Sequence, residues 1–365
     1  MFDLSEKTWS EFFIKDLFIT EIYKNKLQIP TGAYINKKNL QGGLIPRITV
    51  TSQNNGIDSF CISNNKNFRT FTNFISVSFL GTIFYHPYTA SIDMKVHCLQ
   101  LKDRALNQYL SLFLISEIKK SIENASYGNQ LSSTDLPNKK IMLPVDNNGD
   151  PDYEYMEKYI EKIATSKRQE YLGYCTNSIK FGGGVQLSVD YSNNTIWKEF
   201  YIGGDSGIFD IYSGKRLTNA NMDSGTIPFI GATDSNNGIT NWIKTTNKTL
   251  DKNVLGVNYN GSVVESFYHP YNCIFSDDVK RLHLKYGKEN QFVYLFLSTA
   301  IKQQKIKFSY GYKFNQNRMN RQIILLPVDD FGNPDYSFME NYIKSIMVKK
   351  YNSYISYCNK QISCL

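Results

Sequence analysis

The stretch LPVDNNGDPDYEYMEKYI at residues 143–160 returns with few changes as LPVDDFGNPDYSFMENYI at residues 326–343. Neither copy contains an activated nucleophile, a metal-ligand cluster or a phosphate-binding loop, so repeated catalysis is a poor explanation. Pro followed by Asp predicts the start of a helix, with Asp152 and Asp335 as N-caps. Apolar residues then recur at helical spacing in both copies. The stretch therefore predicts, twice, the exit from a domain into a long amphipathic helix.

The repeat extends along the whole chain, and its parts keep the same order in both halves. A period of this length is far too long for a solenoid and indicates a duplicated domain. The other matching pairs are TWSEFFI (8–14) with IWKEFYI (196–202), IPRITVTSQNNGI (45–57) with IPFIGATDSNNGI (227–239), YHPY (85–88) with YHPY (268–271), and SYG (126–128) with SYG (309–311).

Within each half, short segments rich in Val, Ile, Phe, Tyr and Thr alternate with Asn-Gly and Gly-Gly turns, which is typical of strands. One helix is expected in each, at 107–123 and 291–307. We expect an α+β protein with two tandem, mainly β domains, two long antiparallel helices that bury their apolar stripes on each other, and pseudo-twofold symmetry. The predicted parts are a first domain (1–151), a first spacer helix (152–176), a Gly/Ser/Asn linker containing Gly182–Gly184 (177–195), a second domain (196–334) and a second spacer helix (335–362).

The composition is that of a globular protein, with 41% hydrophobic and 20% charged residues in 365. The formal net charge of +8 moderately favours an anionic partner such as nucleic acid. No apolar run is long enough to span a bilayer, and the N-terminus lacks an apolar signal core. Six scattered cysteines without a CxxC pair indicate reduced thiols. These features predict a cytoplasmic protein without a membrane partner.

Two stretches resemble a known family. Residues 207–239, GIFDIYSGKRLTNANMDSGTIPFIGATDSNNGI, are similar to the opening of a target recognition domain, and residues 126–145, SYGNQLSSTDLPNKKIMLPV, are similar to its closing segment. Such domains occur in the specificity (S) subunits of type I restriction–modification systems and in the related type IIB subunits. The resemblance covers both halves, although the first half has KLQIPTGAYINKK (26–38) in place of the SGK pattern.

The resemblance implies a function as well as a fold. Each domain would recognise one half of a bipartite double-stranded DNA sequence, and the helices would set the gap between the halves. The helices would also dock adenine methyltransferase subunits, which use S-adenosylmethionine as their cofactor. A motor or nuclease subunit would complete a restriction complex. The chain itself would hold no cofactor and catalyse nothing.

Candidate DNA-binding residues lie in turns and loops. Gly214 would let the backbone approach a phosphate that Lys215 and Arg216 neutralise; an ordinary solvated turn is the alternative. The Asn-Asn-Gly stretches could present amides to adenine, or could simply be hairpin turns. The loops before each LPVD could combine phosphate anchoring with recognition of base edges. The full set is Ser213, Gly214, Lys215, Arg216, Asn54, Asn55, Asn236, Asn237, Tyr127, Asn129, Gln130, Tyr310, Tyr312, Lys313, Asn315, Gln316 and Arg318.

Two further interpretations are considered. His86 and His269, in the repeated YHPY, lack neighbouring ligands at suitable spacing and are expected to be packed side chains; no metal site is predicted. The many Tyr and Phe residues leave a tandem carbohydrate- or peptide-binding β module as an alternative function. Salt separates the two functions, because DNA binding should collapse at high ionic strength and sugar binding should not.

Overall fold

The computed structural model describes residues 4, 7–181, 195–287 and 289–362. The chain forms two compact units, Met1–Glu170 and Tyr171–Leu365, so the boundary lies inside the first long helix, α3 (Tyr153–Phe181). This helix continues past the predicted end at residue 176, and its last turns occupy the start of the predicted linker. The rest of the linker, including Gly182–Gly184, lies outside the described residues.

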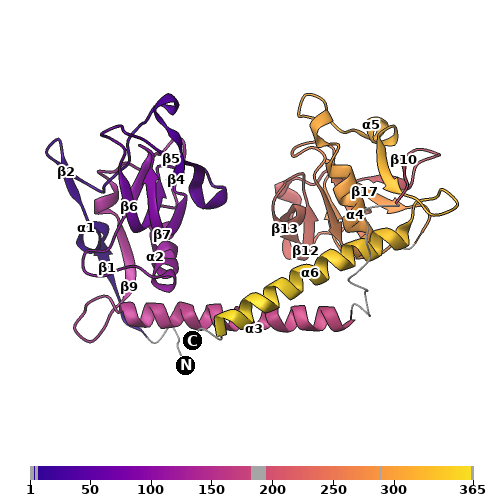
Figure 1. The fold of residues 1–365 in the computed structure, drawn as a ribbon. Coiled ribbons are helices and arrows are strands. Elements are labelled where there is room, and N and C mark those ends of the chain that lie inside the picture. Colours follow the sequence, from indigo (N-terminus) through magenta and orange to yellow (C-terminus); the bar gives the residue numbers. More distant parts are fainter. Residues whose placement is uncertain (1–3, 5–6, 182–194, 288, 363–365) are drawn as a thin grey trace. The chain divides into compact units, whose positions relative to one another are not determined.

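The first unit is built on a five-stranded sheet with the order β5-β4-β7-β6-β8, in which β4 and β7 are parallel and the other neighbours antiparallel (Figure 1). Helix α2 lies against this sheet beside β7, as Figure 1 shows. The elements are β1 (Trp9–Phe13), α1 (Ile14–Leu17), β2 (Glu21–Tyr23), β3 (Lys26–Gln28), η2 (Lys37–Asn39), β4 (Gln41–Ile48), η3 (Asn54–Gly56), β5 (Ile57–Ile62), β6 (Thr70–Ser78), β7 (Ile83–Ile92), β8 (Val96–Leu99), α2 (Gln108–Ser121), η4 (Leu136–Asn138) and β9 (Lys140–Pro144).

The second unit repeats this plan with its strands divided between two sheets, β11-β17-β14-β15 and β13-β12-β16. The single strand β7 of the first unit corresponds to β15 and β16 here, and β12 pairs parallel with β16 as β4 does with β7. The elements are β10 (Trp197–Tyr201), β11 (Phe209–Ser213), η5 (Asn219–Asn221), β12 (Ser224–Ile230), η6 (Asn236–Gly238), β13 (Ile239–Ile243), β14 (Val254–Asn258), β15 (Ser266–His269), β16 (Ile274–Phe275), β17 (Val279–Leu284), α4 (Gln291–Lys302), η7 (Lys305–Lys307), α5 (Gln316–Asn320), β18 (Ile323–Pro327) and α6 (Tyr336–Ile362).

The repeated LPVD stretch closes each domain. The first strand of each repeat pairs antiparallel with the last, so that Trp9 lies opposite Pro144 and Trp197 opposite Pro327. The chain then enters the long helix through the predicted caps. Asp152 accepts a hydrogen bond from the N–H of Tyr155 at 3.0 Å, and Asp335 accepts one from Phe338 at 2.8 Å. Both predicted N-caps are confirmed, and each satisfies an amide that the helix itself leaves unpaired.

Aromatic packing fixes each helix to its own domain in the same way twice. Trp9 stacks on Phe113 of α2 with ring centroids 6.1 Å apart, and Trp197 stacks on Phe296 of α4 at 6.2 Å. A tyrosine of the long helix then meets the phenylalanine edge-on, at 6.3 Å for Tyr159 and 5.8 Å for Tyr342. The apolar stripe of each long helix is therefore covered first by its own domain, where Met156 and Met339 are fully buried.

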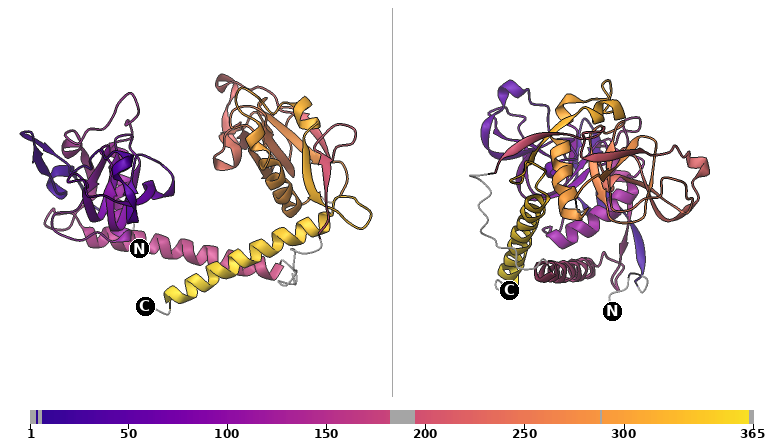
Figure 2. Two further views of the ribbon diagram at one scale, coloured as in Figure 1. Left: turned by 45° about the horizontal axis from the view of Figure 1, so that its top comes forward. Right: turned by 90° about the vertical axis from the view of Figure 1, so that its right-hand side faces the viewer.

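Inside the second unit, the last turns of α3 pack on α6. Tyr171 contacts Tyr354 with ring centroids 4.7 Å apart, and Tyr174 contacts Tyr351 at 5.9 Å. The contact moves forward along α3, from Tyr171 to Tyr174, as it moves backward along α6, from Tyr354 to Tyr351. The two helices are therefore antiparallel where they meet. Both are continuous helices in Figures 1 and 2. The predicted fold class, with two tandem mixed domains and a long antiparallel helix pair, is confirmed.

Two further observations concern the predictions made for membrane spans and for the cysteines. No helix in the described ranges combines the length and the apolar character that a bilayer span requires. The described cysteines, Cys61, Cys98, Cys175, Cys273 and Cys358, are buried free thiols.

Candidate nucleic-acid interface

The predicted basic turn, Ser213–Arg216, directly follows the edge strand β11; we call it the second glycine turn. The N–H of Gly214 donates to the carbonyl of Val279 at 3.2 Å. A Cβ at Gly214 would lie 1.9 Å from the carbonyl oxygen of Ser276, a distance that no side chain tolerates. Packing of the turn on its own domain therefore requires this glycine, and the side chains of Lys215 and Arg216 remain exposed.

The first repeat contains the same turn, although its letters differ. We call Thr31–Tyr34 the first glycine turn. A Cβ at Gly32 would lie 1.9 Å from the carbonyl oxygen of Ile92, and the N–H of Gly32 donates to Val96 at 3.3 Å. The SGK pattern is changed to TGA here, but the backbone arrangement that needs the glycine is retained.

The first glycine turn lacks the basic pair of the second, and a different basic pair follows it. Lys37 and Lys38 are exposed in η2, three residues beyond Tyr34, which is itself 66% exposed. These lysines were not among the residues predicted from the sequence, because they do not occupy the positions that correspond to Lys215 and Arg216. The two consecutive lysines after the glycine were the available signal.

The Asn-Asn-Gly stretches form identical turns, η3 and η6, in which both asparagines have positive φ. The side-chain amide of Asn237 donates to the carbonyl of Tyr268 at 3.3 Å and to the hydroxyl of Tyr271 at 2.9 Å. Asn55 makes the equivalent two bonds to the first YHPY segment, both at 3.3 Å. These two amides hold each turn to its YHPY segment. All four asparagines are exposed, and Asn54 and Asn236 are the two whose side chains are not used in these bonds.

The first closing loop presents one aromatic side chain. Tyr127 is 83% exposed at its tip. The other two candidates are tied inside the loop: the amide of Asn129 donates to the carbonyl of Asn124 at 3.1 Å, and that of Gln130 donates to the carbonyl of Tyr127 at 3.2 Å. The structure therefore leaves Tyr127 as the side chain best placed to contact a ligand.

The second closing loop is more aromatic and more basic. Tyr312 stacks on Phe308, with ring centroids 5.7 Å apart, and the guanidinium carbon of Arg318 lies 3.6 Å from the centroid of the Tyr312 ring. Tyr310 is 74% exposed, and the ammonium of Lys313 lies 5.3 Å from its ring centroid. The loop thus combines exposed rings with cations.

Two polar candidates of the same loop have internal partners. Asn315 is the N-cap of α5 and accepts from the N–H of Arg318 at 3.1 Å. The amide of Gln316 donates to the carbonyl of Ile211 in β11 at 3.4 Å. Gln316 therefore connects the closing loop to the strand that carries the second glycine turn.

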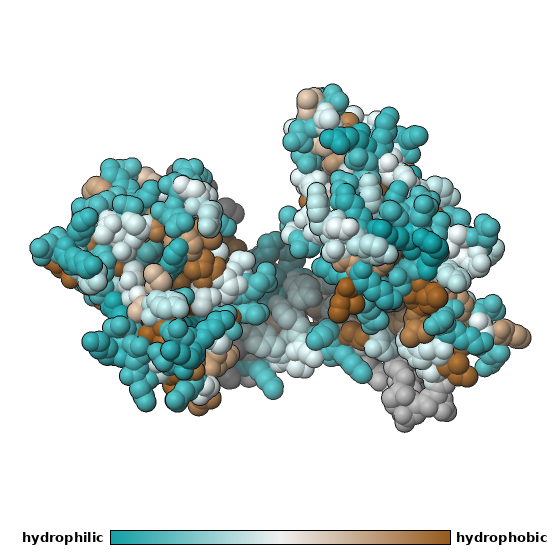
Figure 3. All heavy atoms as spheres, turned by 90° about the horizontal axis from the view of Figure 1, so that it is seen from above, coloured by the Kyte–Doolittle hydropathy of each residue, from teal (hydrophilic) through white to brown (hydrophobic). Residues whose placement is uncertain are grey.

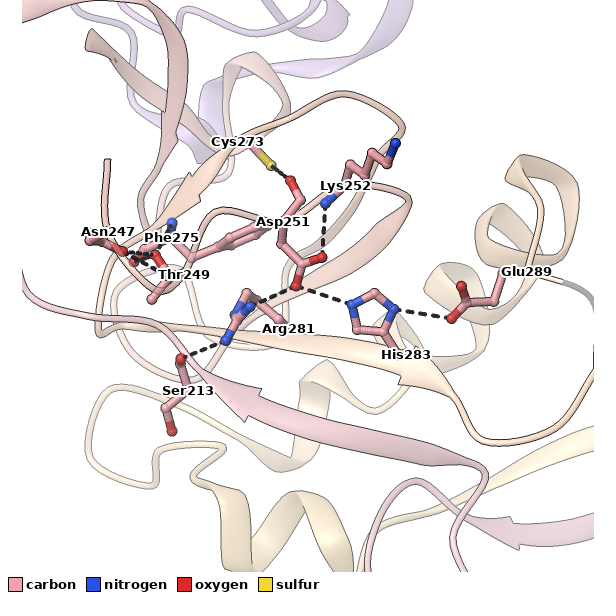
Figure 4. Close-up of polar contacts among 10 residues, drawn as sticks. All are labelled: Ser213, Asn247, Thr249, Asp251, Lys252, Cys273, Phe275, Arg281, His283 and Glu289. Atoms are coloured by element: carbon pink, nitrogen blue, oxygen red, sulfur yellow. Dashed lines mark hydrogen bonds and ion pairs between the residues drawn. The ribbon is translucent and has the colours of Figure 1, made fainter. Parts of the chain in front are cut away.

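A charged cluster that sequence analysis missed lies beside the second glycine turn (Figure 4). Asp251 accepts from Arg281 at 2.7 Å and lies 3.1 Å from Nε2 of His283. The other ring nitrogen of His283 lies 3.2 Å from Glu289. These residues are distant in sequence and form no motif, so only the pairing of β17 with its neighbours brings them together.

His86 and His269 are packed side chains, as expected. Both are fully buried; Nε2 of His86 lies 2.8 Å from the hydroxyl of Ser76, and the ring of His269 packs edge-on against Phe275. Burial lowers the pKa of each from 6.5 to about 4, which favours the neutral ring. Among the residues described, no cluster of three or more His, Cys, Asp or Glu side chains could hold a metal ion.

The surface suits a polar ligand. On the face drawn in Figure 3, hydrophilic residues predominate and hydrophobic patches are small and separate. The large exposed aromatic side chains at loop tips, such as Tyr127 and Tyr310, are single residues or stand beside lysine. Glycine turns with exposed lysine and arginine are arrangements that contact nucleic-acid phosphates.

Comparison with known proteins defines the class. Residues 6–171 and 195–353 each match the type I restriction modification DNA specificity domain, and the two matches coincide with the two repeats. The chain therefore belongs to this family and is a specificity subunit of a restriction–modification system. The specificity subunit S.BcgI of a type II restriction enzyme from Heyndrickxia coagulans is 41% identical to it over 344 residues, which cover 92% of this chain and 93% of that protein.

A solved structure shows the same fold. The S subunit of a type I restriction–modification system from M. genitalium has a TM-score of 0.50 at 15% identity, over 99% of this chain and 95% of that one. The HsdS subunit from Thermoanaerobacter tengcongensis has a TM-score of 0.32 at 10% identity, over 97% and 91% of the two chains. The family membership supports a role in DNA sequence specificity and does not support the carbohydrate- or peptide-binding alternative.

Proposed function

We infer that each repeat recognises one half of a bipartite double-stranded DNA sequence and that the chain positions methyltransferase subunits on it. The observation that carries this proposal is that two DNA specificity domains match the chain separately, one in each structural repeat. One repeat offers a surface for one short site, and a duplicated fold offers a second, similar surface. Two half-sites are the simplest ligand for such a protein.

The proposed DNA contacts divide by chemistry. The exposed cations near the glycine turns, Lys215 and Arg216 in one repeat and Lys37 and Lys38 in the other, would bind phosphate and supply affinity independent of sequence. The exposed tips Tyr127 and Tyr310, the half-buried Lys313 beside Tyr310, and the side chains of Asn54 and Asn236 would contact bases or sugars. Each well-made base contact is worth about 1–3 kcal/mol of discrimination.

The methyltransferase subunits would dock on the long helices. Ile163 of α3 and Ile346 of α6 occupy equivalent positions and are 42% and 37% exposed. In the second unit, Ile346 borders a groove of about 350 Å³ that Trp197 and Phe296 also line. An apolar side chain exposed at the same register in both repeats is expected where two copies of one partner bind.

One relative supports a particular setting. Identity of 41% over nearly the whole length to the specificity subunit of a type II restriction enzyme favours a complex of that kind. The partner would be an adenine methyltransferase using S-adenosylmethionine, and any nuclease would reside in the partner or in a further subunit. The chain would act in the cytoplasm, where the DNA is, and would itself be non-catalytic.

Methylome sequencing tests the proposal directly. A strain carrying the gene and its methyltransferase partner should show methylated adenines in a two-part sequence with a fixed gap, and deletion of this gene alone should abolish them. An empty-vector strain and a strain expressing only the methyltransferase are the controls. Methylation that persists without this chain, or a methylated sequence consisting of a single part, would contradict the proposal.

A binding measurement distinguishes DNA recognition from the carbohydrate- or peptide-binding alternative. The purified complex should bind DNA with an affinity that falls linearly on a log–log plot against salt concentration. Binding to a carbohydrate or peptide array that persists at high salt, with no DNA binding at low salt, would favour the tandem β module instead.

A further inference from the structure

Both glycine turns are held by an arginine that bonds to the same backbone position. Arg69 donates to the carbonyl of Thr31 at 2.9 Å, and Arg281 donates to the carbonyl of Ser213 at 3.3 Å. Thr31 and Ser213 each precede the glycine of their turn. The arginine therefore fixes the backbone immediately before the residues that face solvent.

Each arginine is in turn oriented by a carboxylate and a ring. Glu21 accepts from Arg69 through both oxygens, at 2.8 and 3.1 Å, and the guanidinium lies 5.1 Å from the ring centroid of Phe71. Such a bidentate contact fixes the plane of the guanidinium. Hydrogen bonding from Arg69 is the main reason that the pKa of Glu21 lies below its ordinary value.

The second repeat uses the same three components. Asp251 accepts from Arg281 at 2.7 Å, and the guanidinium lies 5.6 Å from the ring centroid of Tyr212. The side chain of Arg281 is only 13% exposed and that of Asp251 17%. At this degree of burial, removing one partner leaves the other poorly solvated and displaces it.

The two arginines, Arg69 and Arg281, come from different places in the repeat. Arg281 lies within β17 and faces Gly256 across the sheet, whereas the corresponding residue of β8, paired with Ser76, is Cys98. Arg69 instead lies just ahead of β6, and its partner Glu21 comes from the β2–β3 hairpin. Duplication alone does not account for this recurrence, because the equivalent positions hold different residues.

We propose that Glu21–Arg69 and Asp251–Arg281 are positioning pairs, each of which sets one glycine turn for recognition of one DNA half-site. The inference rests on the proposed function. Neither pair needs to touch DNA: the carboxylate holds the arginine, the arginine holds the backbone carbonyl, and the exposed side chains beyond the glycine take their places from it. Each pair controls its own half of the target.

The test replaces each carboxylate by its amide in the complete complex with its methyltransferase. Glu21→Gln and Asp251→Asn keep the shape of the side chain and weaken its hold on the arginine. The matched controls are Glu11→Gln in the first repeat, whose ion pair with Lys140 lies away from the glycine turn, and Glu265→Gln in the second, which pairs with Lys302 and Lys305. Methylation is scored on a DNA library in which every target base is varied.

Glu21→Gln should reduce discrimination about tenfold at bases of one half-site only, and Asp251→Asn should do so in the other half only. Arg69→Lys and Arg281→Lys should affect the same halves, because an ammonium cannot bond both the carboxylate and the carbonyl in the same geometry. Affinity for non-specific DNA should stay near wild type in all variants. The melting temperature should fall most in Asp251→Asn and Arg281→Lys, because their pair is more buried than Glu21–Arg69, so methylation is scored well below it.

The outcomes are distinguishable. If the wild-type complex shows a two-part target and the folded variants keep full selectivity, or lose it equally in both halves, the positioning role is overturned and the proposed function stands. If an amide variant does not fold, the lysine variant of the same pair decides in the same way. If the wild-type complex shows no two-part target, the proposed function itself fails.

Discussion

Asn237 shows that a residue type suited to contacting bases can instead have a structural role. Asn237 was predicted either to contact adenine or to form a hairpin turn, and the structure gives its amide two partners in the YHPY segment. A side-chain amide that already donates to its own domain is poorly suited to base recognition, even though Asn237 itself is exposed. Sequence alone could not decide this, because the partners lie some thirty positions away.

The structural role of Asn237 predicts a graded loss of stability. Asn237→Ala should lower the free energy of unfolding by about 2 kcal/mol, because it removes two hydrogen bonds and places alanine at φ 53°. Asn237→Gly should cost less, since glycine adopts positive φ freely. Urea unfolding of both variants measures the difference; equal stability of Asn237→Ala and wild type would show that the bonds contribute nothing.

The cations of the second glycine turn should act through phosphate. Lys215→Ala with Arg216→Ala should weaken DNA binding and reduce the log–log salt slope by up to about 2, at about 0.9 per phosphate contact. Lys349→Ala with Lys350→Ala, exposed on α6, removes the same charge elsewhere in the second unit and serves as the control. An unchanged slope in the turn variant would show that these side chains do not touch phosphate.

At the scale of elements, the helices were the most predictable part. The signals for α3 and α6 are local: a Pro-Asp start, an N-cap and helical apolar spacing, all within one continuous stretch. Their ends were less predictable, because Asn177–Phe181 contain turn-forming residues that nevertheless continue the helix. The positioning pairs of the glycine turns could not be predicted from the sequence, since residues such as Glu21 and Arg69 come together only when the strands pair.

The N-caps give a prediction for the long helices. Asp335→Ala should lower the free energy of unfolding by about 1 kcal/mol, because the N–H of Phe338 loses its acceptor. Asp152→Ala should cost more, since Asp152 also pairs with Lys7 at 2.5 Å. Asp335→Asn, which can still accept the hydrogen bond, is the matched control and should remain within a few tenths of a kcal/mol of wild type.

Buried histidines give the sheets a pH dependence. Burial lowers the pKa of His86, His97 and His269 to about 4, against 6.5 for an exposed ring. The unfolded chain binds more protons below pH 6.5, so stability is full above that pH and falls as the pH decreases. Each of these histidines should lower the free energy of unfolding by about 2 kcal/mol at pH 5 relative to pH 7.5. Calorimetry from pH 7.5 to 5 measures this, and a constant melting temperature over that window would contradict it.

In the molecule as a whole, the internal repeat is the feature from which most of the architecture could be predicted. Order and duplication of loose motifs predicted two similar domains, and both the strand pairing and the family matches coincide with them. What the repeat concealed is the difference between its copies. The second copy has the Asp251 cluster and a basic closing loop, while the first has Lys37 and Lys38, so the two halves are alike in backbone and unlike in surface chemistry.

The same symmetry predicts how many methyltransferase subunits the chain binds. If Ile163 and Ile346 each contribute to one docking surface, the intact chain should bind two copies. Ile163→Asp and Ile346→Asp should each leave one, and the double variant none, because a buried unpaired carboxylate costs several kcal/mol at an interface. Both side chains are partly exposed, so the free chain should tolerate the change. Native mass spectrometry of the co-expressed complex counts the subunits. Loss of both copies from either single variant would mean that the partners bind as one preformed pair, and an unchanged count in the double variant would place the docking surface elsewhere.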